Sequence, residues 1–319
     1  MDPAAIRRAA KATLSGEGSF EAVAREWHER FKPKWAKSHA VALLSRFSRH
    51  VFPYIGARPV NEISAPEMLA VLRRIEKSAP ETARQTKISC GQVFRYAVAS
   101  GYATNDPTVA LREALPPIIT KHMAAPTDPK DVAPLLRMLD GYQGSPVVCA
   151  ALNLAPLVFV RPGELRNAEW KSIDLEQAEW RYLVTKTKTE HIVPLSQQAV
   201  KILQGLYPLT GMGKYVFPSA RSMSDPMSNN AVNAAMRRMG IDTQNELTGH
   251  GFRAMARTIL DEVLGYRPDI IEHQLAHAVK DPMGRAYNRT AHLPARKEMM
   301  QAWADYLDRL KAGVLIVPS

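Results

Sequence analysis

The first hundred residues place hydrophobic side chains at the spacing of amphipathic helices. The first such stretch carries its apolar residues on one helix face: Phe20, Val23, Ala24, Trp27 and Phe31. Three more stretches follow. The third helix starts at a capping box of Ser64 and Glu67, and the fourth stops near Gly101. The pattern therefore predicts a four-helix unit over about residues 19–105.

Prolines then interrupt the helical pattern. Four of them follow within a short span: Pro116, Pro117, Pro126 and Pro129. They cannot all lie within one helix, because proline lacks an amide proton and clashes with the preceding turn. We therefore expect an inter-domain linker over residues 112–128. Thr127 or Asp128 can cap the next helix, with Pro129 in its first turn.

The rest of the sequence is mostly helical with one β-rich patch. Strands are expected at Trp180–Thr185 and His191–Leu195, and "SIDL" after Trp170 is a candidate third strand. The predicted fold class is mainly α with a small antiparallel β-sheet. The expected organisation is a linker or helical extension at 1–18, a helical domain at 19–111, the linker at 112–128, a second domain at 129–305 and a C-terminal tail at 306–319.

The net charge of the chain indicates a binding partner. The net charge is +11 and the sequence pI is about 9.7. Such an excess usually accompanies a polyanion, either nucleic acid or an anionic membrane, although a basic surface without a partner is the alternative. No apolar run approaches the roughly 20 residues that span a bilayer, and the N-terminus lacks the apolar region of a signal peptide. We therefore expect a cytoplasmic protein that binds no membrane.

The sequence offers little for cofactor or metal chemistry. Its two cysteines, Cys90 and Cys149, form no CxxC motif or His/Cys cluster, so no zinc site is predicted. Whether these two pair with each other is left open. No GxxxxGK[ST] loop or GxGxxG motif occurs, so nucleotide-driven chemistry is not indicated. We expect neither a cofactor nor a metal.

Several polar residues of the second domain have two interpretations. Arg161 follows the apolar run "PLVFV". It is interpreted either as half of a buried ion pair with Glu164 or as a functional cation. His250 and Arg253, three apart, fall on one helix face and point away from its apolar side, into a site or into solvent. Tyr287 has few apolar residues at its i±3 and i±4 positions, which argues mildly against a core role.

Five blocks together resemble a known family. "RPGEL", "KTEHIVPLS", "HGFR", "LAHAVKDPMGRAYNR" and "MMQAWADYLD" look like the tyrosine recombinases, and most like phage and genomic-island integrases. The resemblance covers about residues 19–310. It implies a SAM-like helical core-binding domain, a catalytic domain of the DNA breaking-rejoining fold, and integration or excision of a mobile element through a 3′-phosphotyrosine. The arm-site-binding domain common in such integrases is not visible, so we expect a truncated or naturally short form.

The resemblance assigns six catalytic residues, with the tyrosine as nucleophile: Arg161, Lys186, His250, Arg253, His277 and Tyr287. Two guanidiniums suit the charge on phosphate oxygens and stay ionised, so no metal is required. A tyrosine with a pKa near 10 needs a base such as His250.

The leaving oxygen needs an acid, for which Lys186 is suited. Lys188 would share its strand face, so parity cannot choose between them. The alignment of "HIVPLS" favours Lys186, which leaves Lys188 as a phosphate contact or a solvated turn residue.

Other residues are candidates for DNA contacts. Asn230, Asn233 and Arg237 fall at i, i+3 and i+7, and such side chains read base edges, although contact with phosphate or water alone is the alternative. Arg285 and Arg289 flank the tyrosine and are candidate phosphate-positioning residues.

The resemblance implies double-stranded attachment-site DNA as partner and a tetramer on that DNA, with accessory DNA-bending and directionality factors as further candidates. The stretch "ADYLDRLKAGVLIVPS" either exchanges between protomers or docks on its own chain. Two other functions share these features. A type IB topoisomerase uses the same residue types to relax DNA, and a non-catalytic architectural protein would use only the basic surface.

Overall fold

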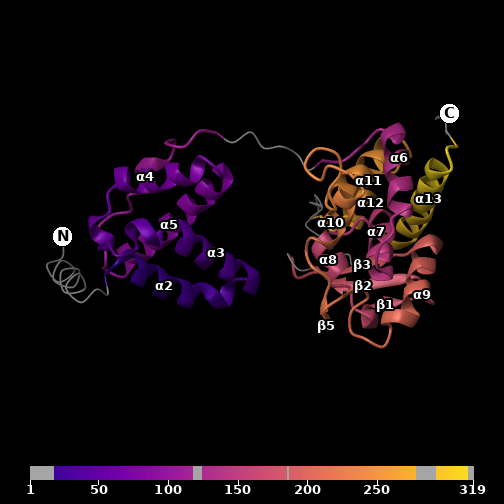
Figure 1. Cartoon of the computed structure of the whole chain (residues 1–319), viewed down its shortest axis with the longest axis horizontal. Coiled ribbons are helices and arrows are strands. Elements are labelled where there is room, and N and C mark those ends of the chain that lie inside the picture. The colour runs from indigo at the N-terminus through magenta and orange to yellow at the C-terminus, as the bar shows by residue number, and fades with distance from the viewer. Residues whose placement is uncertain (1–17, 118–123, 185–186, 278–291, 315–319) are drawn as a thin grey trace. The chain divides into compact units, whose positions relative to one another are not determined.

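The chain divides into two compact units, residues 1–120 and 121–319 (Figure 1). Each unit has its own hydrophobic core. The computed structural model describes residues 18–117, 124–184, 187–277 and 292–314. The division falls inside the stretch where the prolines led us to expect a linker.

The N-terminal unit is the predicted four-helix unit. Its helices are α2 Phe20–Phe31, α3 Lys37–His50, α4 Ala65–Glu76 and α5 Pro80–Ala99, with short 3-10 turns at Lys32–Lys34, Val60–Glu62 and Val109–Leu111 and a π turn at Phe52–Gly56. The ring of Phe20 packs 5.3 Å from that of Phe94, so α2 and α5 share the core. The Ser64–Glu67 capping box is confirmed, because Ser64 N donates to Glu67 Oε2 at 2.9 Å and Glu67 N donates to Ser64 Oγ at 3.4 Å.

The second unit is mostly helical. Its helices are α6 Pro129–Asp140, α7 Pro146–Val158, α8 Pro162–Arg166, α9 Gln197–Thr210, α10 Ala231–Arg238, α11 Gly251–Glu262, α12 Pro268–Gln274 and α13 Leu293–Lys311, with a 3-10 turn at Trp170–Ser172. Asp128 is the cap of α6, because its Oδ1 accepts the amide of Lys130 at 3.0 Å.

Three antiparallel strands form the predicted sheet, in the order β1 Ile173–Asp174, β2 Glu179–Leu183 and β3 Glu190–Pro194. Tyr182 pairs with His191 across β2 and β3. A second, two-stranded sheet of β4 Pro218–Ser219 and β5 Ser222–Pro226 corrects the expectation of a single sheet. The sequence of β5, "SMSDP", lacks the alternation of apolar residues that would have predicted it.

Helix α13 anchors the second unit, packing against α6, α7, α12 and β3. Trp303 is fully buried and its Nε1 donates to the Pro156 carbonyl at 2.9 Å. The helix runs past the predicted start of the tail at residue 306, and three of its last residues are buried: Tyr306, Leu307 and Leu310. Residues 306–311 therefore belong to the core, because their apolar spacing continues that of the helix.

Both cysteines are free thiols. Cys90 is buried in the N-terminal unit and Cys149 lies half-buried in α7, so they do not pair. Burial raises the pKa of the Cys90 thiol, which makes it a core residue rather than a nucleophile. Across the described residues, each helix is too short or too polar to cross a bilayer.

Candidate active site

Phe159 turns the chain sharply after α7. It has a left-handed conformation with φ +34°, which costs a non-glycine residue about 1–2 kcal/mol. Its buried ring packs edge-on at 6.2 Å from Trp303, which stabilises this conformation. Nη1 of Arg253 donates to the Phe159 carbonyl at 3.0 Å, so the bend joins α7 to α11 just before Arg161 at the start of α8.

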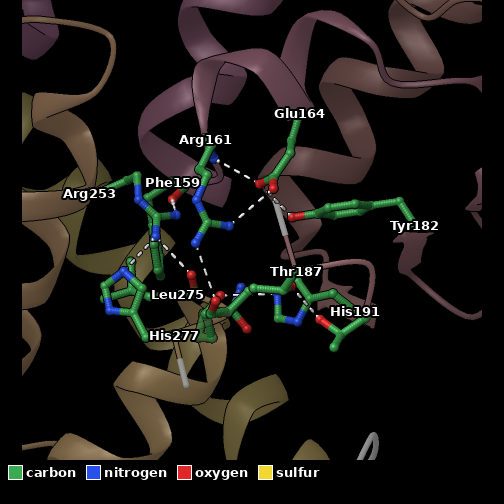
Figure 2. Close-up of polar contacts among 12 residues, drawn as sticks. Phe159, Arg161, Glu164, Tyr182, Thr187, His191, Arg253, Leu275 and His277 are labelled. Carbon is green, nitrogen blue, oxygen red and sulfur yellow. Dashed lines mark hydrogen bonds and ion pairs between the residues drawn. The ribbon is translucent and has the colours of Figure 1, made fainter. Parts of the chain in front are cut away.

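Arg161 is held from two directions (Figure 2). Its Nη1 donates to Oε1 of Glu164 at 3.1 Å, and its Nη2 donates to the Ala276 carbonyl at 3.3 Å. Glu164 also accepts the Tyr182 hydroxyl at 2.9 Å. The ion pair considered from the sequence is therefore present. The Arg161 side chain nevertheless keeps 22% exposure, so a ligand can reach it.

Tyr182 is a second tyrosine beside the arginines. Burial, and then Glu164, raise the pKa of Tyr182 well above its ordinary value. Its phenol therefore stays protonated and serves as a hydrogen-bond donor to Glu164. A phenol in this setting is a poor nucleophile.

Arg253 is buried, with 6% exposure, which corrects the expectation that it points away from the core with His250. Its Nη2 donates to the Leu275 carbonyl at 2.8 Å and to Nε2 of His277 at 3.1 Å. Burial, and then Arg161, lower the pKa of Arg253 to about 10, so it remains charged at neutral pH. Backbone carbonyls compensate this buried charge, which is why helical spacing alone did not reveal it.

His277 is oriented by a carboxylate. Its Nδ1 lies 2.5 Å from Oε2 of Glu272, and Nε of Arg257 donates to Oε1 of the same group at 2.8 Å. Because Arg253 can only donate, Nε2 of His277 accepts and Nδ1 carries the proton, an assignment that follows from the network. Burial alone would raise the pKa of Glu272, but the hydrogen bonds from His277 and Arg257 outweigh it, and the pKa is lowered.

His250 lies just before the first turn of α11, which begins at Gly251, rather than on a helix face. Partial burial, and then Arg253 and Arg161, lower the pKa of His250. The imidazole is therefore neutral at pH 7 and can accept a proton.

Three consecutive backbone carbonyls connect these groups. We call the main-chain oxygens of Gln274, Leu275 and Ala276 the carbonyl run. They accept, in order, from His191 Nε2 at 3.1 Å, Arg253 Nη2 at 2.8 Å and Arg161 Nη2 at 3.3 Å. The run ends α12, where the helix dipole is negative and favours cations.

Of the two candidate lysines between β2 and β3, the structure describes Lys188. Lys188 lies in the turn between β2 and β3 with φ +57°, and its amide donates to the Val184 carbonyl at 2.8 Å. The expectation that Lys186 and Lys188 share a strand face is therefore wrong, because Lys188 is a turn residue. Lys186 itself lies outside the described residues.

The predicted DNA-reading residues of α10 have structural contacts as well. Oδ1 of Asn233 accepts the amide of Gly249 at 2.8 Å, next to His250, and Nη1 of Arg237 donates to Thr243 Oγ1 at 3.0 Å. Asn230 is exposed just before the helix. Base reading by these residues stays a prediction.

Three predicted residues, Tyr287, Arg285 and Arg289, lie outside the described residues. The structure brings Arg161, Arg253 and His277 into one network. Within the described ranges, no group of three or more His, Cys, Asp or Glu side chains is arranged to hold a metal ion.

Sequence reasoning missed six polar residues around these groups. They are Tyr182, His191, Arg257, Glu272, Gln274 and Arg296, the last of which donates to Oε1 of Gln274. Glu272 stands five positions before His277, a spacing that no helix or strand period would pair, and the left-handed Ala276 brings the two together. Nothing in the spacing singled out Arg296, which is followed by the charged residues Lys297 and Glu298.

Comparison with known proteins gives two family matches. Residues 20–114 match the phage integrase central domain, and residues 128–292 match the phage integrase family. The integrase of Enterobacteria phage P4 is 36% identical over 325 residues, covering 97% of this chain and 73% of that protein. A prophage integrase of Escherichia coli K12 is 35% identical over 302 residues, which cover 94% of this chain and 74% of that integrase.

Solved structures share the fold at lower identity. A lambda integrase tetramer bound to a Holliday junction aligns with a TM-score of 0.66 and 16% identity, over 87% of this chain and 83% of that one. The Tn1549 transposon integrase in complex with circular intermediate DNA aligns with a TM-score of 0.57 and 13% identity, over 86% and 98% of the two chains.

Replacing Ala276 by glycine should stabilise the protein, although an alanine-to-glycine change usually destabilises one. The φ of Ala276, +51°, is strained for alanine but not for glycine. We expect Ala276→Gly to raise the free energy of unfolding by about 0.5–1 kcal/mol. Ala254→Gly, at an exposed site inside α11, is the matched control and should lower it by about 1 kcal/mol. Urea unfolding of the full chain measures both, and equal losses would show that Ala276 carries no strain.

Acid should destabilise this unit through His191. Burial, and then Arg296, lower the pKa of His191 to about 3 from an ordinary 6.5. Between these values the unfolded chain binds a proton that the folded chain does not, so stability present above pH 6.5 is lost as the pH falls. At pH 5.5 the loss from His191 is about 1 kcal/mol.

The matched variant is His191→Gln, which keeps an N–H donor for the Gln274 carbonyl but does not titrate. Urea unfolding at pH 7.5 and 5.5 should show a smaller loss for this variant than for the wild type. Parallel losses in the two proteins would contradict the assignment.

Proposed function

The chain belongs to the phage integrase family of tyrosine recombinases, and we propose that it cuts and rejoins DNA through a covalent 3′-phosphotyrosine at Tyr287. The observation that carries the proposal is the convergence of two guanidiniums. Arg161 and Arg253 bind adjacent carbonyls of one helix end, and Arg161 is open to a ligand. Two such cations suit a phosphodiester, whose non-bridging oxygens gain charge during attack.

The proposed reaction is a transesterification. The Tyr287 hydroxyl attacks the scissile phosphorus, forming a bond from phosphorus to the phenolic oxygen and breaking the bond to the 5′-oxygen. His250, neutral at pH 7, accepts the phenolic proton, and Lys186 protonates the leaving oxygen. The 5′-hydroxyl of a partner strand then reverses these steps. The phosphoester energy is retained, so no nucleotide is consumed.

Arg253 and His277 act together in this proposal. Glu272 and Arg257 fix the imidazole, which in turn binds Arg253. We propose that this chain of contacts keeps the Arg253 guanidinium in place beside the phosphate.

Double-stranded attachment-site DNA is the proposed partner, supported by the net charge of +11. Because the related lambda integrase fold was solved as a tetramer on a Holliday junction, we propose that this chain also assembles as a tetramer on paired sites. Accessory DNA-bending and directionality factors are further proposed partners. The proposed DNA-contacting residues are Lys188, Asn230, Asn233, Arg237, Arg285 and Arg289.

A nicked duplex carrying a candidate attachment site tests the nucleophile, because loss of the short fragment traps the adduct. Wild-type protein should give a covalent protein–DNA band, and Tyr287→Phe should abolish it, since phenylalanine has no hydroxyl. Tyr182→Phe is the matched control and should retain the band, because that phenol is a buried donor to Glu164.

A covalent band that persists in Tyr287→Phe and is lost in Tyr182→Phe would show that Tyr182, not Tyr287, is the nucleophile. Relaxation of supercoiled DNA without joined products from two sites would instead indicate a topoisomerase.

A further inference from the structure

Arg296 is a buried cation in the first turn of α13, with 2% exposure. Its Nε and Nη2 donate to Oε1 of Gln274 at 2.9 and 2.8 Å, and Nη2 also donates to the Ile192 carbonyl. These acceptors are uncharged. Burial lowers the pKa of Arg296 to about 10, so it keeps its charge at neutral pH. Such a group is costly to bury and needs a structural reason to be there.

The acceptors of Arg296 lie on the two elements that border the catalytic network. Ile192 belongs to β3 and Gln274 ends α12. The same two elements meet a second time, because His191 of β3 donates to the Gln274 carbonyl. Arg296 thus joins α13, β3 and α12, and it does so through the side chain of Gln274, whose main-chain oxygen is the first member of the carbonyl run.

The next two members of the run hold the arginines, and one of them is strained. Leu275 binds Arg253, and Ala276, in the left-handed conformation, binds Arg161. A strained conformation persists only where its surroundings fix it. Clamping the Gln274 side chain fixes the residue that precedes both carbonyls.

We infer that Arg296 is a positioning residue: by clamping Gln274 and β3 it sets the carbonyl run, and through the run it aims the Arg253 and Arg161 guanidiniums at the phosphate. This inference rests on the proposed recombinase function. Arg296 itself does not touch the DNA. Removing Arg296 should therefore slow cleavage only because Arg161 and Arg253 neutralise the charge of the scissile phosphate less well.

A neutral substrate separates this role from a general loss of fold. A methylphosphonate at the scissile position replaces one charged non-bridging oxygen by a methyl group, so cleavage depends less on the guanidiniums. Arg296→Met should slow adduct formation on the phosphate substrate by about 10- to 100-fold, as expected for groups displaced by a fraction of an ångström. On methylphosphonate the deficit should shrink to about threefold or less.

Three comparisons calibrate the result. Arg161→Ala should show the same pattern of large loss on phosphate and small loss on methylphosphonate. Arg296→Lys keeps the charge and should recover part of the rate. Arg309→Met, at an exposed position of the same helix, should stay within about twofold of wild type on both substrates. Rates are taken in single turnover and normalised to the fraction of protein that binds DNA.

If Arg296→Met does not fold, Gln274→Met takes its place, because it removes the shared acceptor and leaves the cation. Equal losses on both substrates for these variants would overturn the inference and leave Arg296 a structural residue. Failure of the proposed function has a different signature, in which wild-type protein forms no adduct on either substrate.

Discussion

A buried positive charge must find acceptors, and in the catalytic unit the decisive acceptors are the last carbonyls of α12. Arg161 and Arg253 bind two successive oxygens at this helix end, where the backbone dipole favours cations, and the neutral His191 binds the oxygen before them. Helix α12 is short, but its end sets where both guanidiniums lie. The surrounding elements fix the position of the C-terminal end of α12.

This arrangement is built in layers from distant parts of the sequence. Glu272 and Arg257 fix His277, and Arg296 fixes Gln274. Buried networks of this kind specify one arrangement when every member is satisfied and are costly when one is missing. In the proposed mechanism Arg161 and Arg253 neutralise the phosphate charge, while these partners hold the two guanidiniums in position.

Much of the fold could be predicted because its signals are local. Apolar spacing gave the four helices of the N-terminal unit, and the capping box at Ser64 marked a helix start that the structure confirms. The family motifs indicated Arg161, Arg253 and His277, which the structure brings together.

The remainder depends on contacts that sequence periodicity does not encode. Helical spacing pointed Arg253 away from the core, into a site or into solvent, because spacing cannot show that the carbonyls of Phe159 and Leu275 accept its hydrogen bonds. Strand parity failed at Lys188, which a left-handed backbone places in a turn. The pairing of Glu272 with His277 required the left-handed Ala276 between them.

The Gln274–Arg296 contact has a consequence for the length of chain that carries the proposed nucleophile, Tyr287. It joins Gln274 to Arg296, so two residues on either side of residues 278–291 are held to each other. Tyr287 stands five positions before His292, and a fully extended backbone covers at most about 3.6 Å per residue, so its α-carbon stays within about 18 Å of that anchor. If Tyr287 is the nucleophile, as proposed, the scissile phosphate must come within reach of its side chain, and so within about 18 Å plus the length of one tyrosine side chain from His292.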